Sequence, residues 1–163
     1  MQLKKKDIIK LKIKNNMRYM RLIVNVVNKS KHRLPEYETP NSAGMDLKAD
    51  IDEPYKLKAR GSIVIPTGLY ISLPDGYEAT IRSRSGLAFK YDITAFHGLI
   101  DADYRGEIKV KLFNHSDNDF LIHPGERIAQ LKVAPVVRVD WNEVSELDTT
   151  ERGAGGFGST GIN

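Results

Sequence analysis

The sequence contains no cysteine, a single tryptophan and no long apolar run. Without cysteine the chain cannot form a disulfide scaffold, a zinc–thiolate or iron–sulfur centre, or a cysteine nucleophile. No stretch approaches the roughly 18 consecutive apolar residues that cross a bilayer, and no apolar segment with a cleavage site follows the basic amino terminus. These absences predict a soluble, cytoplasmic protein that does not associate with a membrane.

A chain of 163 residues is close to the size of one ordinary domain. Hydrophobic residues make up 40% of it and charged residues 28%, which is enough apolar material for a core and too much for a disordered chain. We expect a basic amino-terminal extension over residues 1–19, one domain over residues 20–147 and a glycine-rich arm over residues 148–163.

The net charge of +4 is distributed unevenly along the chain. Residues 1–19 contain six lysines and one arginine against Asp7, a net charge of +6, which leaves −2 for all the other residues. Nucleic-acid binding is therefore not expected of the main domain. We interpret residues 1–19 as a flexible, solvated extension, and the alternative is a tether to nucleic acid or to an acidic partner.

Short runs of alternating or β-branched apolar residues recur from Met20 onward. The first run places Leu22, Val24 and Val26 on one face of a strand, and turn-forming glycine, proline, asparagine and aspartate residues separate the later runs. The pattern predicts an all-β sandwich, jelly roll or barrel, with further strands over residues 62–65, 69–73, 78–82, 107–113, 120–122, 127–133 and 136–139. A brief helical turn is expected only at residues 141–147.

The sequence changes character after Leu147, because residues 148–161 contain five glycines and Phe157 as their one large apolar side chain. Such a segment cannot build a core, and a mobile tail is the simplest interpretation. However, an arginine, a phenylalanine, two hydroxyls and accessible main-chain N–H groups are also the components of a clamp for phosphates and an aromatic ring. A flexible arm that orders on a ligand is therefore the second interpretation.

Two clusters contain candidate anion-binding or carboxylate chemistry near the start of the domain. Asp46 follows a glycine at the entrance of a strand, where the simpler interpretation is a carboxylate that caps local N–H groups. Residues 82–88 place two arginines, two serines and a glycine at the end of a strand, where successive N–H groups can converge on an anion. This segment is not a Walker loop, because it lacks the terminal Gly-Lys-Ser/Thr.

Two later clusters are richer in polar groups. Residues 98–107 contain Asp101, Asp103, a tyrosine, an arginine and a glutamate, and the sequence leaves open whether the two aspartates share a site or point to opposite faces. In residues 125–131, strict alternation would place Ile128 and Gln130 on one face. If that face is the core, Gln130 is a buried amide that needs hydrogen-bond partners.

Other catalytic and metal patterns are missing from the sequence. The four histidines have no metal-ligand spacing, and we interpret them as ordinary loop residues. No Gly-x-Ser-x-Gly elbow occurs and Ser85 has no local base, so acyl transfer is disfavoured.

Taken in order, the clusters and the arm resemble the five motifs of the trimeric deoxyuridine triphosphate nucleotidohydrolases (dUTPases). The matching segments are Ala-Gly-Met-Asp-Leu at 43–47, Arg-Ser-Gly-Leu-Ala at 84–88, residues 98–106, Gly-Glu-Arg-Ile-Ala-Gln-Leu at 125–131 and residues 152–161. The resemblance runs from about Met20 to the end and leaves out residues 1–19. It implies a jelly-roll or distorted β-barrel subunit, and a homotrimer in which the arm of one chain closes a neighbouring subunit's active site.

The resemblance also implies an activity and a role for each matching residue. The activity would be Mg²⁺-dependent hydrolysis of dUTP to dUMP and pyrophosphate, which limits uracil in DNA and supplies dUMP for thymidylate synthesis. Asp101 would be the catalytic base, and Asp46 would act on Mg²⁺ through a water or through Arg152. The triphosphate would be bound by Arg84, Ser85, Gly86, Gln130, Arg152, Gly158, Ser159 and Thr160. The deoxyuridine would be bound by Gly98, Leu99, Ile100, Tyr104, Lys109 and Phe157.

One segment departs from the family pattern. Some family members place an asparagine side chain in the uracil hairpin, where residues 93–98 of this chain read Ile-Thr-Ala-Phe-His-Gly. Main-chain groups or His97 would then carry more of the base recognition. The alternatives to a dUTPase are a dCTP deaminase of the same fold and a dUTPase-like regulatory protein that binds nucleotide without cleaving it.

Overall fold

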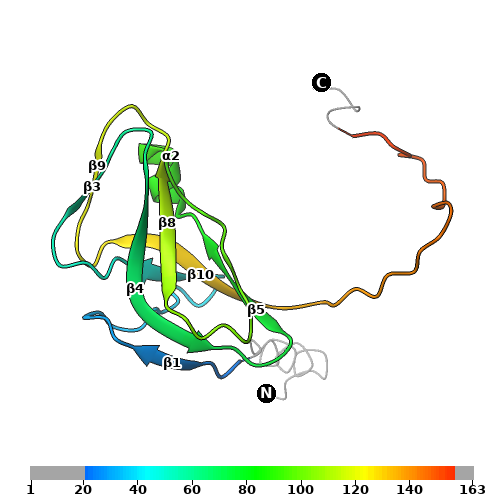
Figure 1. Cartoon of the computed structure of the whole chain (residues 1–163), viewed down its shortest axis with the longest axis horizontal. Helices are drawn as coiled ribbons and strands as arrows, with labels where there is room; N and C mark the ends of the chain where they lie inside the picture. Colours follow the sequence, from blue (N-terminus) through cyan, green and yellow to red (C-terminus); the bar gives the residue numbers. More distant parts are fainter. Residues whose placement is uncertain (1–20, 157–163) are drawn as a thin grey trace, which may run out of the picture.

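The structure is a computed structural model that describes residues 21–156, and it consists mainly of β-strands with a short helix (Figure 1). The elements are β1 (Asn25–Asn28), β2 (Met45–Lys48), β3 (Tyr55–Leu57), β4 (Ser62–Ser72), β5 (Tyr77–Arg82), α2 (Ser85–Tyr91), β6 (Ile93–Ala95), β7 (Leu99–Ile100), β8 (Ile108–Asn114), β9 (Phe120–Ile122) and β10 (Arg127–Pro135). The predicted all-β class is confirmed. Within residues 21–156, no helix is long and apolar enough to span a membrane.

The strands form two four-stranded antiparallel sheets, in the orders β1-β4-β8-β6 and β2-β10-β5-β7, and a separate pair of β3 with β9. All three sheets remain open over the described residues, so no closed barrel is present there. The expectation that the sheets close into a barrel is therefore corrected. Strands β1 and β7 are edge strands, because each has a strand partner on one side only, and residues of each line a cavity.

The core lies between the two large sheets and follows the alternation of the sequence. Strand β8 shows the pattern most clearly, because Ile108, Val110 and Leu112 are buried while Lys109 and Lys111 are exposed. A strand turns successive side chains to opposite faces, so this apolar–basic alternation gives one core face and one polar face. The buried side chains of the other sheet include Leu47, Ile81, Ala129 and Leu131.

Three predicted elements differ from the structure. The runs at 62–65 and 69–73 are parts of one strand, β4, interrupted by a bulge between Pro66 and Leu69. At the bulge the Thr67 hydroxyl donates to the main-chain oxygen of Ile108 over 2.6 Å. The predicted strand at 136–139 and helical turn at 141–147 do not form. Their apolar residues pack against no partner within residues 21–156, since Val137 and Trp141 are 87% and 93% exposed.

The helix occurs instead at α2, in a segment that the sequence predicted to bind an anion at the end of a strand. Leu87 and Ala88 donate their N–H groups to the main-chain oxygen of Arg84, and Leu87 is buried against the core. The helix ends at Asp92, whose left-handed conformation (φ 54°) lets its N–H return to the Ala88 and Leu87 oxygens. Burial of Leu87 and the main-chain hydrogen bonds at both helix ends therefore stabilise this helix, which is too short to show a periodic sequence pattern.

The chain leaves the folded body after β10 and extends away from it as an irregular segment without strand or helix (Figure 1). Residues 136–152 are all exposed, among them the large apolar side chains of Val137, Trp141 and Leu147. Isolated chains rarely leave such side chains in water without a partner.

Candidate functional site

The carboxylate of Asp46 is the centre of a buried polar cluster at the ends of three elements. Its side chain is only 7% exposed. Oδ1 accepts hydrogen bonds from Arg84 Nε over 3.1 Å and Gln130 Nε2 over 3.2 Å, and Oδ2 accepts one from Arg127 Nη1 over 3.1 Å. A carboxylate buried among two guanidiniums and an amide is fully satisfied and fixes the orientation of all three donors.

The strand register explains how these side chains meet. In the sheet, β10 lies between β2 and β5, and Gln130 is opposite both Asp46 and Arg82. A bulge between Arg127 and Ala129 changes the alternation, so that Ile128 and Ala129 are both buried while Gln130 is half-buried. Gln130 therefore does not follow Ile128 into the core, contrary to strict alternation, and its amide binds Asp46 at the edge of the cluster.

The start of α2 adds N–H donors beside this cluster. Ser85 and Gly86 are its first two residues, directly after Arg84. The first N–H groups of a helix have no acceptor within the helix and are free to bind an anion. A Cβ at Gly86 would meet no atom within 4 Å, so the space beside it is open. An open cavity of about 570 Å³ next to these groups is lined by Glu38, Lys48, Arg84, Gly125, Glu126 and Arg127.

A second cavity collects the residues predicted to bind deoxyuridine within the described chain. Its volume is about 240 Å³, and its lining includes Gly98, Leu99, Ile100, Asp101, Tyr104 and Lys109. The Ile81 N–H donates to the Gly98 oxygen over 2.9 Å, which joins the hairpin to β5. Strand β7 pairs with β5 on one side only, so the main-chain groups of its other side face outward from the sheet.

The wall of this cavity is organised around Glu107. The Tyr104 hydroxyl donates to the Glu107 main-chain oxygen over 3.0 Å. Glu107 Oε1 accepts from the N–H of Gly68, at the β4 bulge, over 3.0 Å, and Oε2 lies 3.7 Å from Lys109 Nζ. The bulge of β4 and the start of β8 therefore position Tyr104 and Lys109 together.

The two aspartates of the richest segment share one cavity wall. Asp101 and Asp103 both line an open cavity of about 860 Å³ that also contains Asp75 and Glu78. Asp101 in addition lines the deoxyuridine cavity, so it lies where the two cavities meet. The sequence left this arrangement open.

The structure does not bring all the predicted residues together. The Asp46 cluster and the deoxyuridine cavity share no lining residue. Arg152 lies in the extended segment, where its Nε donates to the Gly155 oxygen over 2.8 Å, and Asp46 is held by Arg84 and Arg127. Phe157, Gly158, Ser159 and Thr160 lie outside the described residues, as do residues 1–19. The roles assigned to all these residues remain predictions.

Two residues of the cluster, Arg127 and Glu38, have no signal in the local sequence. Arg127 belongs to the segment at 125–131, but no local pattern shows that it reaches Asp46, which is 81 positions away. Within residues 21–156, no group of three or more carboxylate or histidine side chains is arranged to hold a metal ion.

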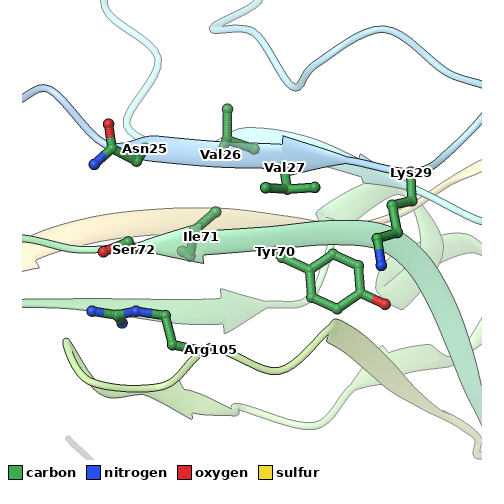
Figure 2. A pocket seen from close by; sticks show the side chains of 8 residues that line it. All are labelled: Asn25, Val26, Val27, Lys29, Tyr70, Ile71, Ser72 and Arg105. Carbon is green, nitrogen blue, oxygen red and sulfur yellow. The ribbon is translucent and has the colours of Figure 1, made fainter.

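A groove of about 390 Å³ lies away from these clusters, over the β1 and β4 edge. Figure 2 shows Val26 and Val27 on β1 beside Tyr70 and Ile71 on β4, with Lys29 and Arg105 at the ends. It contains no residue to which the sequence analysis gave a binding role.

Comparison with known proteins identifies the family to which the chain is similar. A family model described as dUTPase matches residues 30–161. The deoxyuridine 5′-triphosphate nucleotidohydrolases of Rickettsia conorii and Anaplasma marginale are 56% and 52% identical over 131 and 130 residues, which cover 79% and 78% of this chain and 88% of each relative. A Staphylococcus bacteriophage 80alpha dUTPase solved with dUpNHpp superposes with a TM-score of 0.74 at 30% identity, covering 86% of this chain and 99% of the phage protein.

Proposed function

The chain belongs to the dUTPase family, and on that premise we propose that it hydrolyses dUTP to dUMP and pyrophosphate by attack of water on the α-phosphorus. The proposal rests mainly on the cavity that contains Gly98, Leu99, Ile100, Asp101, Tyr104 and Lys109, since one space of about 240 Å³ holds the groups needed for both base and sugar. By this activity the protein would limit uracil in DNA and supply dUMP for thymidylate synthesis.

Selection of uracil depends on the outward side of β7. The main-chain N–H and C=O groups of β7 that face away from β5 would pair with the donor and acceptor edge of uracil, and Lys109 would add a donor. Cytosine presents a different order of donors and acceptors. Thymine adds a methyl group, which the main chain around Gly98 would exclude.

Selection of deoxyribose depends on Tyr104. Its ring is held at the cavity wall by the hydrogen bond to Glu107 and would lie against the sugar. A ribose 2′-hydroxyl would need the volume that the ring fills. Phe157 of the arm would stack on uracil, a contact of about 1–3 kcal/mol by analogy with other base–aromatic stacking.

The triphosphate would be bound by charge-assisted donors. Arg84, Gln130 and the N–H groups of Ser85 and Gly86 supply them from the body, and Arg152, Gly158, Ser159 and Thr160 would supply them from the arm. Asp46 already accepts from Arg84 and Gln130, so these donors are oriented before the substrate arrives.

Catalysis would require a carboxylate that orients the attacking water and accepts its proton. Asp101 has this position in the family motif, and it lines both the deoxyuridine cavity and the open cavity from which water would enter. The α-phosphate, which follows the sugar directly, would lie beside it.

Magnesium fits this site only in an indirect role. Both oxygens of Asp46 accept hydrogen bonds from cationic or amide donors, so this carboxylate is suited to contact Mg²⁺ through a water. Mg²⁺ retains several waters and prefers phosphate oxygens, and it would neutralise part of the triphosphate charge. Asp46 would then hold the phosphate donors and the hydrated ion together.

A homotrimer would complete the site. The phosphate cluster and the deoxyuridine cavity share no lining residue, which is the arrangement expected if each active site takes its two halves from different subunits. The exposed Val137, Trp141 and Leu147 would be covered by a neighbouring subunit, and the groove at the β1 edge is an open apolar surface (Figure 2).

The test of this function is pyrophosphate release from dUTP by the purified full-length protein, with Mg²⁺ and with Mg²⁺ removed by a chelator. We expect rapid release with dUTP and Mg²⁺, little release from dCTP, dTTP or UTP, and loss of activity after chelation. Ammonia release from dCTP in place of pyrophosphate release would indicate the deaminase. Binding of dUTP without any cleavage would indicate the regulatory alternative.

A further inference from the structure

Arg127 is a cation of the Asp46 cluster to which the sequence analysis assigned no role. Its Nη1 atom donates to Asp46 Oδ2 over 3.1 Å and to Glu38 Oε1 over 3.2 Å. The Arg84 guanidinium donates to its main-chain oxygen over 2.9 Å. Arg127 therefore connects a buried carboxylate, which is 7% exposed, with a surface carboxylate, which is 62% exposed.

The cavity beside Arg127 has the charge of an anion site that is partly blocked. Lys48, Arg84 and Arg127 line it together with Glu38 and Glu126. Glu126 Oε2 accepts from the N–H of His123 over 2.9 Å and so caps its own turn. Glu38 instead binds a cation of the cavity wall, and it belongs to an irregular, exposed segment between β1 and β2.

We propose that Arg127 is a further triphosphate-binding residue. Glu38 is an internal anion that accepts a hydrogen bond from the outward N–H of Arg127 until a phosphate oxygen replaces it. This inference rests on the proposed hydrolysis of dUTP. A guanidinium Nη carries two N–H protons. One of them is directed to Asp46 and the other to Glu38, so departure of Glu38 frees one donor without loss of the Asp46 contact that orients it.

The exchange favours phosphate over the glutamate for two physical reasons. A phosphate group carries more charge than a carboxylate and offers more acceptor oxygens to a guanidinium. The contact with Glu38 is half-exposed, and exposed ion pairs are weak because water screens them and because two long side chains must be held still. Glu38 therefore lowers the affinity for an anion without closing the site.

The position of Arg127 indicates which phosphates it binds. The α-phosphate has to lie beside Asp101, which lines the deoxyuridine cavity. Arg127 lines the other cavity, so it would contact the β- or γ-phosphate. Pyrophosphate should therefore compete with Glu38, whereas dUMP, which has only the α-phosphate, should not.

The experiment compares KM for dUTP and the inhibition constants of pyrophosphate and dUMP in single and double variants. Glu38→Gln should lower KM and the pyrophosphate constant about two- to fivefold, the value of an exposed ion pair. Arg127→Gln should raise both by about 10- to 100-fold, as expected for loss of a hydrogen bond to a charged group. Neither variant should change the dUMP constant.

Three controls separate this mechanism from general effects. Glu36→Gln removes the same charge from the same exposed segment and should leave all three constants unchanged. In the Arg127→Gln background, Glu38→Gln should have no effect, because the contact it removes is already lost. Arg127→Lys keeps the charge, and pyrophosphate binding is measured with this variant as well in case Arg127→Gln fails to fold.

The opposite signs of the two single variants are the decisive result. If Glu38→Gln raises KM for dUTP, or gives the same three constants as Glu36→Gln, Glu38 is not a competing anion. If Arg127→Gln and Arg127→Lys leave pyrophosphate binding unchanged, Arg127 is not a phosphate ligand. A parent protein that cleaves no dUTP would contradict the proposed function instead, and calorimetric binding of pyrophosphate and dUpNHpp to the same variants would still decide the roles of Arg127 and Glu38.

Discussion

The Tyr104 hydroxyl donates to the main-chain oxygen of Glu107 over 3.0 Å, and the ring crosses the space directly above Gly106. A Cβ at position 106 would overlap the hydroxyl end of the ring. The ring can therefore reach this hydrogen bond only because residue 106 has no side chain. The position of the Tyr104 ring at the cavity wall thus depends on a glycine that does not itself line the cavity.

Gly106→Ala should displace Tyr104 from the cavity wall. We expect kcat/KM for dUTP to fall by up to about 100-fold, as expected when a positioned group moves by about an ångström. The preference for dUTP over UTP should narrow, and measuring kcat/KM for both nucleotides checks this.

Tyr104→Phe is the matched control for that change. It removes the hydroxyl but keeps the ring, so the preference for dUTP should be largely retained. Equal losses of preference in both variants would show that the hydrogen bond, and not the volume of the ring, selects deoxyribose.

Asp101→Asn should abolish turnover while the protein still binds the nucleotide. An asparagine cannot accept the proton of the attacking water, and general-base catalysis contributes about 10²- to 10⁴-fold. Single-turnover kinetics and calorimetric binding of dUpNHpp measure the two effects separately. Asp103→Asn, on the same cavity wall, is the control and should keep most of the activity. Substantial activity in Asp101→Asn would remove this residue as the base.

Asp46→Asn should reduce the stability of the fold as well as activity. The change leaves two guanidiniums and an amide around a neutral group that is only 7% exposed. We expect the free energy of unfolding to fall by about 1–3 kcal/mol, the cost of leaving buried polar groups unsatisfied. Urea denaturation at one fixed protein concentration measures this.

Asp52→Asn provides the contrast for that measurement. Asp52 pairs with Lys31 on the surface, where both side chains are largely exposed. Its replacement should leave the urea midpoint unchanged, because solvent screens such pairs. A shift as large as that of Asp46→Asn would mean that burial does not explain the stability of the Asp46 cluster.

Removal of residues 152–163 should strongly reduce kcat/KM and leave the oligomer intact. Residues 136–152 are exposed and extend away from the body, so we expect the fold to form without residues 152–163. Light scattering and steady-state kinetics check the two parts. Removal of residues 1–19 is the control, and it should leave turnover unchanged. Unchanged turnover after loss of residues 152–163 would mean that this segment is a mobile tail and not an arm that orders on a ligand.

Local pattern was enough to predict the strands whose two faces differ in polarity. Strands β5, β8, β9 and β10 occur where alternating or β-branched runs predicted them. The run at 136–139 has the same composition as a strand but pairs with none of the strands in the described part of the chain, and so the prediction failed there. The two-residue strand β7 and the seven-residue helix α2 are too short to show a period and depend on tertiary contacts.

By itself the sequence determined the all-β class, the order of the five motifs and the residue types of the candidate site, since side-chain periodicity and motif spacing are local properties. Only the tertiary structure decided that Asp46, Arg84, Arg127 and Gln130 form one cluster. That cluster depends on the register of β10 between β2 and β5 and on a bulge before Gln130. Register and bulges are set by the packing of residues far apart in the chain, which no short segment encodes.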